Sequence, residues 1–190
     1  DIPSNRKRHI GSIPLIGGLA IFFCLIIITI IFDFPKKFEI LIYSSSFLVL
    51  VGFLDDIYQL NAKIRLIFQT ISIGVMIYFS NLYITNIGPL YTFTNINIGF
   101  FAIPLTIFVS LGLVNAFNFS DGIDGLASGQ ALITLFLVII ALKMSNNNIY
   151  QIEFLSILVS VLFIYFLVKI SVLPIKKIFL GDAGSTLIGF

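Results

Sequence analysis

The sequence predicts an all-α polytopic integral membrane protein, and its composition and its apolar runs are the observations that predict it. Of 190 residues, 58% are hydrophobic and only 11% are charged, and the mean hydropathy is +1.10. A soluble domain is typically about 45–50% apolar and about 25% charged. Apolar runs of about 20 residues, the length that spans a bilayer as a helix, recur along the chain. The net charge of only +2 gives no support to nucleic-acid binding.

Six apolar runs are predicted to span the membrane as complete helices, and the start of a seventh follows. The six cover residues 11–32, 39–54, 64–80, 99–117, 126–143 and 154–173, and the seventh begins near Ser185. The second and third runs are short, so tilted or half-buried helices are expected there. The polar segment 81–97 is predicted to hold a short irregular or hairpin structure. Residues 1–190 contain no repeat or linker and are interpreted as a single membrane-embedded domain, which we expect to be incomplete at both ends.

The basic residues predict the orientation of these helices. Short cytoplasmic loops carry an excess of Lys and Arg. If the amino end lies inside, alternation also places residues 55–63, 118–125 and 174–184 inside. The inner face then holds eight basic residues and the outer face holds three. The inner ones are Arg6, Lys7, Arg8, Lys63, Arg65, Lys169, Lys176 and Lys177, and the outer ones are Lys36, Lys37 and Lys143.

Five aspartates from three separate loops fall on the same inner face: Asp55, Asp56, Asp121, Asp124 and Asp182. Because the orientation was set from basic residues alone, this convergence is an independent observation. An aspartate held within the bilayer costs about 3 kcal/mol, and adjacent carboxylates repel unless a cation lies between them. The alternative without a functional role for Asp55 and Asp56 is a hydrated helix end with a charged turn.

The stretch "NAFNFSDGIDGLASG" carries the second acidic loop. If it is helical as far as Asp121, then Asn115, Asn118 and Asp121 lie near one face. The two Asp-Gly pairs that follow indicate turns, and their backbone amides can approach a phosphate closely. Turns alone would explain the glycines, but they leave the two asparagines unexplained.

The third acidic stretch, "FLGDAGSTLIGF", places Asp182 just before an apolar run. Two interpretations stay open: helix capping by Asp182 or Ser185, and a metal-ligating carboxylate beside a helix N-terminus. Mg²⁺ usually binds through one or two carboxylates and substrate phosphates. Five carboxylates exceed that need, so some of them must orient other groups, pair with Lys or Arg, or act on a proton.

The opening stretch "RKRHIGSIPLIGG" combines a basic flank with two glycines. The flank either sets the topology and contacts anionic lipid headgroups, or it attracts an anionic substrate, with His9 as a candidate substrate-binding residue. Gly17 and Gly18 inside a helical run indicate close packing against another helix.

Together, the motifs "RKRHIGSIPLIGGLAIF", "GFLDDIYQL", "NAFNFSDGIDGLASG" and "FLGDAGS" resemble the polyprenyl-phosphate N-acetylhexosamine-1-phosphate transferases, in order and over nearly the whole chain. The opening is more similar to the branch that uses UDP-GlcNAc and undecaprenyl phosphate than to the phospho-MurNAc-pentapeptide translocases, which usually carry a "TPTMGG"-like stretch. The resemblance implies transfer of an N-acetylhexosamine-1-phosphate, commonly GlcNAc-1-phosphate, from a UDP-sugar to undecaprenyl phosphate, with release of UMP. The product would initiate cell-envelope polysaccharide synthesis.

The resemblance further implies a requirement for Mg²⁺ or Mn²⁺, a place in the bacterial inner membrane among its lipids, and an active site that faces the cytoplasm. A homodimer is compatible with the resemblance. The family's His-rich cytoplasmic loop would lie beyond Phe190, so this stretch is expected to be incomplete as a catalyst.

The resemblance also assigns roles position by position. Asp55 and Asp56 match the acidic pair, one of which would act as a base, and Asp121 and Asp124 match the second catalytic acidic loop. The substrate-binding positions are Asn115, Asn118, His9 and either Lys63 or Arg65, and the metal-binding positions are Asp182 and Asp121. A phosphate monoester with a second pKa of about 6 is mostly dianionic at pH 7, so a base is chemically optional. Asp182 as metal ligand is therefore preferred over Asp55 or Asp56 as base.

A cation-coupled transporter is the alternative from another class. Intramembrane acids often mark ion paths, and glycine-broken helices often line transporter sites. The predicted clustering of acids on one face, instead of at the bilayer midplane, and the absence of inverted repeats favour the enzyme. A purely structural subunit would leave the three acidic clusters unexplained.

Overall fold

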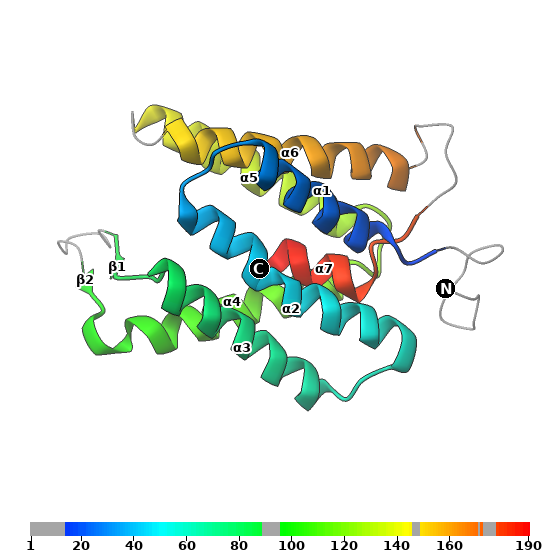
Figure 1. Ribbon diagram of the computed structural model, residues 1–190, viewed down its shortest axis with the longest axis horizontal. Helices are drawn as coiled ribbons and strands as arrows, with labels where there is room; N and C mark the ends of the chain where they lie inside the picture. Colours follow the sequence, from blue (N-terminus) through cyan, green and yellow to red (C-terminus); the bar gives the residue numbers. More distant parts are fainter. Residues whose placement is uncertain (1–13, 89–95, 146–148, 171, 173–177) are drawn as a thin grey trace.

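The computed structural model describes residues 14–88, 96–145, 149–170, 172 and 178–190 (Figure 1). Its elements are α1 (Gly17–Ile31), α2 (Lys36–Tyr58), α3 (Ala62–Ser80), β1 (Asn86–Ile87), β2 (Ile96–Asn97), the 3-10 helix η1 (Gly99–Phe101), α4 (Ala102–Ser120), α5 (Leu126–Met144), α6 (Ile149–Lys169) and α7 (Gly181–Gly189). Five of them, α2, α3, η1 with α4, α5 and α6, are long and apolar enough to cross a membrane. The predicted fold class, an all-α polytopic membrane protein, is confirmed.

The first helix is shorter than predicted. It has 15 residues and begins at Gly17, because the residues before it pair with the segment before α7. The backbone N–H groups of Gly17 and Gly18 donate to the carbonyls of Phe179 and Leu180, both at 3.0 Å, and Phe179 N donates to Pro14 O at 3.1 Å. These bonds satisfy first-turn N–H groups that a helix cannot pair internally. The helix start is therefore set by a partner far away in the sequence.

The second helix is longer than predicted, and the expectation of a short span there is wrong. It has 23 residues and continues past the apolar run to Tyr58, so both acids of the pair lie near its end. Gln59 closes the helix in the left-handed region at φ 52°, and Leu60 N donates to Asp55 Oδ1 at 2.6 Å. This side-chain bond stabilises the end of a helix that hydropathy alone would end earlier.

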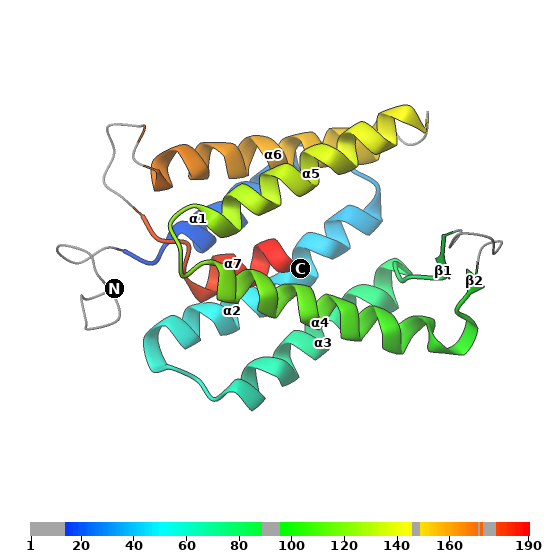
Figure 2. The ribbon, with the colours of Figure 1, turned by 180° about the vertical axis from the view of Figure 1, so that it is seen from behind.

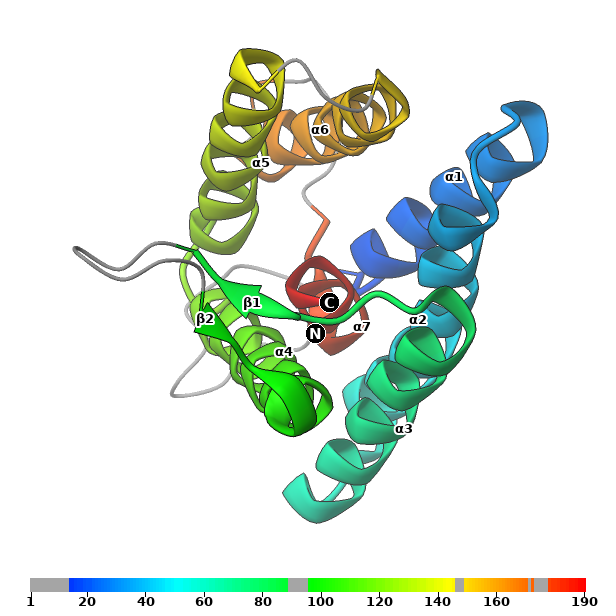
Figure 3. The same ribbon diagram turned by 90° about the vertical axis from the view of Figure 1, so that its left-hand side faces the viewer.

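The short helix α7 lies in the middle of the bundle, as the end-on view shows (Figure 3). It contacts α1, α2, α4 and α5. Glycines allow this close approach: a side chain at Gly18 would collide with the backbone of Gly184, and one at Gly52 with that of Ala183. The close packing predicted from Gly17 and Gly18 is confirmed.

The helices α5 and α6 form an antiparallel pair on one side of the bundle (Figure 2). An aromatic contact joins α6 to the start of α2, where the Phe38 and Phe154 rings stack with centroids 4.6 Å apart. Between α3 and α4, β1 and β2 form a two-stranded antiparallel ribbon that pairs Asn86 with Asn97. Of the irregular or hairpin structure predicted for residues 81–97, the described residues show two paired antiparallel strands.

Candidate functional site

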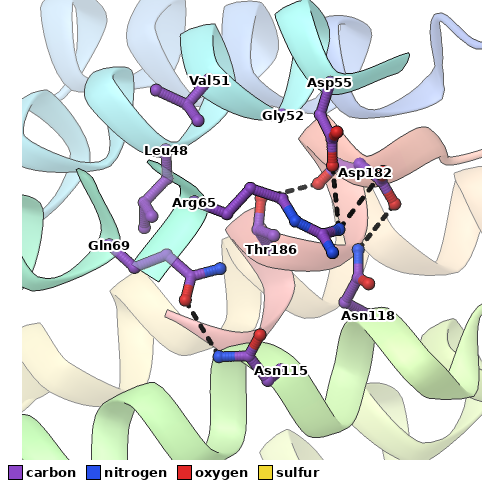
Figure 4. Close-up of a pocket in the computed structure, with 10 residues that line it drawn as sticks. All are labelled: Leu48, Val51, Gly52, Asp55, Arg65, Gln69, Asn115, Asn118, Asp182 and Thr186. Carbon is purple, nitrogen blue, oxygen red and sulfur yellow. Dashed lines mark hydrogen bonds and ion pairs between the residues drawn. The ribbon is translucent and has the colours of Figure 1, made fainter. Parts of the chain in front are cut away.

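A polar pocket lies where the end of α2, the start of α3, the end of α4 and the start of α7 meet (Figure 4). Its lining residues are Leu48, Val51, Gly52, Asp55, Arg65, Gln69, Asn115, Asn118, Asp182 and Thr186. Segments from all along the chain therefore meet at one end of the bundle, as the inner-face clustering of the acids predicts.

Arg65 bridges two carboxylates in this pocket. Its Nη1 donates to Asp55 Oδ2 at 2.9 Å and lies 3.9 Å from Asp182 Oδ2. The Asp55 side chain is 4% exposed, whereas that of Arg65 is 34% exposed. A buried acid thus holds a guanidinium that still reaches solvent. Because Asp55 is buried and paired, the alternative of a hydrated helix end does not describe it.

Asn118 orients Asp182 from the opposite side. Its Nδ2 donates to Asp182 Oδ1 at 2.7 Å and to Ser185 Oγ at 3.0 Å. The Asp182 carboxylate therefore lies between an amide from α4 and an arginine from α3. An amide and a guanidinium on the same carboxylate fix its direction more tightly than either would alone.

Asp56 caps the N-terminus of α7 from another helix. Its carboxylate accepts hydrogen bonds from the backbone N–H of Asp182 at 2.9 Å and of Ala183 at 3.5 Å. A helix N-terminus carries partial positive charge and unpaired N–H groups, so a carboxylate stabilises it. Of the two interpretations left open for this stretch, capping by Asp182 or Ser185 is wrong, because the N-cap of α7 is Leu180, whose side chain makes no cap bond.

A second pair of amides continues the pocket towards the bundle interior. Asn115 Nδ2 donates to Gln69 Oε1 at 2.9 Å and to Leu111 O at 2.8 Å. Gln69 is buried at 4% exposure. Gln69 was not among the predicted site residues, although the sequence carries a signal for it. It lies four residues after Arg65 in an apolar run, and this spacing places both on one helix face.

The loop between α4 and α5 carries a separate charge cluster. Lys169 Nζ, at the end of α6, lies 3.5 Å from Asp124 Oδ1 and 3.9 Å from Asp121 Oδ1. The Lys169 side chain is 2% exposed, and its Nζ is 4.1 Å from the centroid of the Phe179 ring. From the sequence, Lys169 was predicted only to lie on the inner face. Its signal was a single lysine at the end of a long apolar run.

Burial raises the pKa of Asp121 from 3.8 to about 6. The Lys169 ammonium opposes this rise, while the negative charges of Asp56 and Asp124 add to it. Because Asp56 caps α7, the two charge clusters influence each other through space. Asp121 therefore connects the loop after α4 electrostatically to the pocket.

The structure groups the predicted site residues into three sets and leaves two apart. Asp55, Arg65, Asn115, Asn118 and Asp182 line the pocket, Asp56 caps α7, and Asp121 and Asp124 surround Lys169. Lys63 is exposed and is not among the residues that line the pocket. His9 lies outside the described residues.

The carboxylates of the site offer a divalent cation an incomplete set of ligands. Among the described residues, no three His, Cys, Asp or Glu side chains converge as a ready-made ligand set. Mg²⁺, however, usually keeps waters and binds through one or two carboxylates and substrate phosphates. The Asp182 carboxylate, 35% exposed at the pocket, fits such an incomplete site. The residues are thus compatible with an ion whose shell the substrate completes.

Fold and site together define a polytopic membrane protein with a pocket of polar and charged side chains at one end of its helix bundle. The chain belongs to glycosyl transferase family 4, whose sequence model matches residues 38–190. The resemblance stated from the motifs is thereby confirmed.

Several curated bacterial proteins are similar to the whole chain. The undecaprenyl-phosphate alpha-N-acetylglucosaminyl 1-phosphate transferases of Escherichia coli (strain K12) and Yersinia pestis are each 33% identical to it over 193 residues. A probable undecaprenyl-phosphate N-acetylglucosaminyl 1-phosphate transferase of Bacillus subtilis (strain 168) is 31% identical over 193 residues. The chain spans about half the length of these relatives, 52% of each.

Proposed function

We propose that the protein is a phosphoglycosyl transferase that moves GlcNAc-1-phosphate from UDP-GlcNAc to undecaprenyl phosphate. The products are UMP and a lipid-pyrophosphate-linked sugar that initiates a cell-envelope polysaccharide. The observation that carries this proposal is the pocket in which Arg65, Asn118 and Asp182 meet, in a chain of glycosyl transferase family 4. The names of the relatives support undecaprenyl phosphate as the acceptor and N-acetylglucosamine 1-phosphate as the group transferred.

The reaction exchanges one phosphoanhydride for another. An oxygen of the acceptor phosphate attacks the phosphorus that bears the sugar, and the bond from this phosphorus to the oxygen of UMP breaks. Phosphoryl transfer depends mostly on positioning and on charge neutralisation. The partly exposed guanidinium of Arg65 is suited to bind a phosphate. The N–H groups of Asn115 and Asn118 already donate to protein acceptors, so these residues would bind the substrate through their amide oxygens, which accept from hydroxyl or N–H groups.

The acidic pair is assigned mainly to orientation. Both carboxylates already accept hydrogen bonds from protein groups, Asp55 from Arg65 and Leu60, and Asp56 from the start of α7. The acceptor phosphate is mostly dianionic at pH 7 if its second pKa is about 6. A residue that removes a proton from it is therefore not required, although one of the pair acting as base is what the resemblance implies.

Mg²⁺, or Mn²⁺ in its place, is the proposed cofactor, held by Asp182 and Asp121 together with substrate phosphates. When bound, a divalent cation neutralises the negative charge that develops on the phosphate oxygens. Asn118 would keep the Asp182 carboxylate turned towards the pocket for this purpose.

The proposed location is the bacterial inner membrane, with the pocket facing the cytoplasm. The excess of Lys and Arg on that face supports this orientation. A homodimer stays a prediction. The transporter alternative is not favoured, because Asp55, Asp121 and Asp182 lie at helix ends and not at mid-helix.

The test is UMP release by the full-length protein in membranes. It would receive undecaprenyl phosphate and a panel of UDP-N-acetylhexosamines, with Mg²⁺ or with a chelator. We expect release that depends on both lipid and metal and is fastest with UDP-GlcNAc. A folded full-length protein that releases no UMP with any of these sugars would contradict the proposed function.

A further inference from the structure

We propose that Lys169 is a positioning residue that holds the loop after α4 in its active geometry. The inference rests on the proposed function for its catalytic consequence, but not for its structural content. It follows from the cluster in which Asp121, Asp124 and the ring of Phe179 surround the Lys169 ammonium. No single sequence motif contains all four of these residues.

The burial of Lys169 requires partners. An ammonium group taken out of water costs several kcal/mol unless opposite charges and hydrogen-bond acceptors compensate it. Lys169 is 2% exposed, and among the described residues two carboxylates of one loop lie beside its ammonium, at 3.5 Å and 3.9 Å. The ring of Phe179 provides a cation–π contact on another side. The loop and the lysine therefore depend on each other for their placement.

The loop also packs on the end of α6 through an independent contact. Gly125, at φ +76°, approaches α6 so closely that a side chain there would lie 3.2 Å from both Ile170 and Phe166. Glycine alone adopts this backbone conformation without strain and leaves room for these neighbours. Apolar packing and ion pairing thus attach the same loop to the same helix end.

Phe179 extends this arrangement to the pocket. It lies three residues before Asp182, and its carbonyl accepts from Gly17 N at 3.0 Å. Lys169 consequently contacts both the loop that carries Asp121 and the segment that leads into α7. Lys169 can therefore influence the relative positions of Asp121 and Asp182, the two proposed metal-binding carboxylates, although they belong to different elements.

Lys169 is assigned to positioning and not to substrate contact because its side chain is almost fully enclosed. Arg65, by comparison, is 34% exposed and reaches the pocket. A lysine at 2% exposure has its ammonium occupied by Asp121, Asp124 and Phe179. It acts on the reaction through the carboxylates that it holds.

The experiment compares Lys169→Met and Lys169→Arg in the full-length protein, reconstituted in lipid. The matched control is Lys143→Met, because Lys143 lies exposed at the other end of the same helix pair. Two quantities are measured: the backbone amide exchange of residues 121–127 and the rate of UMP release. The exchange readout does not depend on catalysis, so it remains valid if the proposed function fails.

In Lys169→Met we expect faster exchange confined to the loop and to the start of α5, because Asp121 and Asp124 lose the ammonium that lies between the loop and α6. We expect kcat to fall about 10- to 100-fold, as for other residues that orient a metal ligand. Lys169→Arg should recover part of both quantities, and Lys143→Met should change neither. Unchanged loop exchange in Lys169→Met, or a loss of activity with no change in the loop, would overturn the assignment.

A second variant keeps the test informative if Lys169→Met does not fold. Asp124→Asn removes the nearer ion pair at a half-exposed side chain, 51% accessible, so the fold should tolerate it. It should also accelerate loop exchange. Combining it with Lys169→Arg should give less than the sum of the two single effects, since both act on one contact. Additive effects would overturn the proposed coupling.

Discussion

Asp55 and Asp56 are neighbours in sequence but have different partners in the structure. Successive residues on an α-helix point about 100° apart. Asp55 therefore faces α3 and binds Arg65, whereas Asp56 faces α7 and caps it. A pair of carboxylates that would repel each other side by side is thus separated by helix geometry, and each has compensating donors.

The negative charge of the Asp182 carboxylate is the property that the metal-ligand assignment requires. Asp182→Asn keeps the shape and the contact with Asn118 but removes the negative charge, so we expect metal-dependent UMP release to fall about 100-fold or more. Initial rates over a Mg²⁺ titration in the full-length protein provide the measurement. Asp33→Asn, at an exposed aspartate before α2, is the matched control and should behave as wild type. Wild-type rates in Asp182→Asn would refute the metal-ligand assignment.

The raised pKa of Asp121 predicts a pH-dependent metal requirement. With a pKa of about 6, the carboxyl is ionised at pH 7 and mostly protonated at pH 5, whereas an aspartate at 3.8 would stay ionised at both. Protons then compete with the metal, so the Mg²⁺ concentration for half-maximal rate should rise as the pH falls through 6. Rates at several Mg²⁺ concentrations between pH 7 and pH 5 check this. A half-saturating concentration that is constant over this range would contradict the placement of Asp121 at the metal.

At the scale of elements, helix contacts depend on where glycines lie. Gly18→Ala would force a methyl group of α1 into the backbone of Gly184 in α7, and such overpacking costs about 1–3 kcal/mol of unfolding free energy. Gly74→Ala is the matched control, because nothing lies within 4 Å of a side chain at that position of α3. The control should be neutral or stabilising by about 0.5–1 kcal/mol. Thermal unfolding midpoints in detergent measure both, and equal midpoints would contradict the close approach of α1 and α7.

The elements also show what sequence reasoning can and cannot predict here. Hydropathy located every long helix, and basic-residue counting placed the acids at one end, because both depend on properties of single segments. The predicted start of α1 and the predicted end of α2 were wrong, because tertiary and side-chain hydrogen bonds set these two boundaries. Gly17 N donates to Phe179 O at the start of α1, and Leu60 N donates to Asp55 Oδ1 at the end of α2.

In the candidate site too, local features could be predicted from the sequence and tertiary contacts could not. The asparagine spacing of α4 was visible in the sequence, but the partners Gln69 and Lys169 were not, since tertiary contacts select them. The capping of α7 by Asp56 joins residues 126 positions apart in the chain, and no local pattern carries that information.

At the scale of the whole molecule, the end of α2 and the ribbon of β1 and β2 lie towards opposite ends of the bundle (Figure 1), and Asp55 near the end of α2 lines the pocket. The helix α3 connects them, starting beside the pocket and ending before β1. Its 19 residues rise about 1.5 Å each, which is close to the thickness of a hydrocarbon core. The two ends should therefore be accessible from opposite sides of the membrane.

Cysteine labelling tests this arrangement. The single cysteine, Cys24, would first be replaced by Ala. Tyr58→Cys, at the pocket end, and Asn86→Cys, in the hairpin, are both at exposed positions. In sealed vesicles of known orientation, an impermeant maleimide should label Tyr58→Cys only from the cytoplasmic side and Asn86→Cys only from the other. The reversed pattern would contradict the proposed orientation, and labelling of both from one side would contradict the transmembrane arrangement of α3.

The central place of α7 also has a consequence for biosynthesis. This helix comes after α1 to α6 in the chain, yet it contacts α1, α2, α4 and α5. While the ribosome has completed only those six helices, Arg65 can already pair with Asp55, but Asp56 has no helix to cap and Asn118 has no carboxylate to orient. The pocket is consequently completed by the last described helix to be translated, and a chain arrested before residue 181 would enter the membrane without a working site.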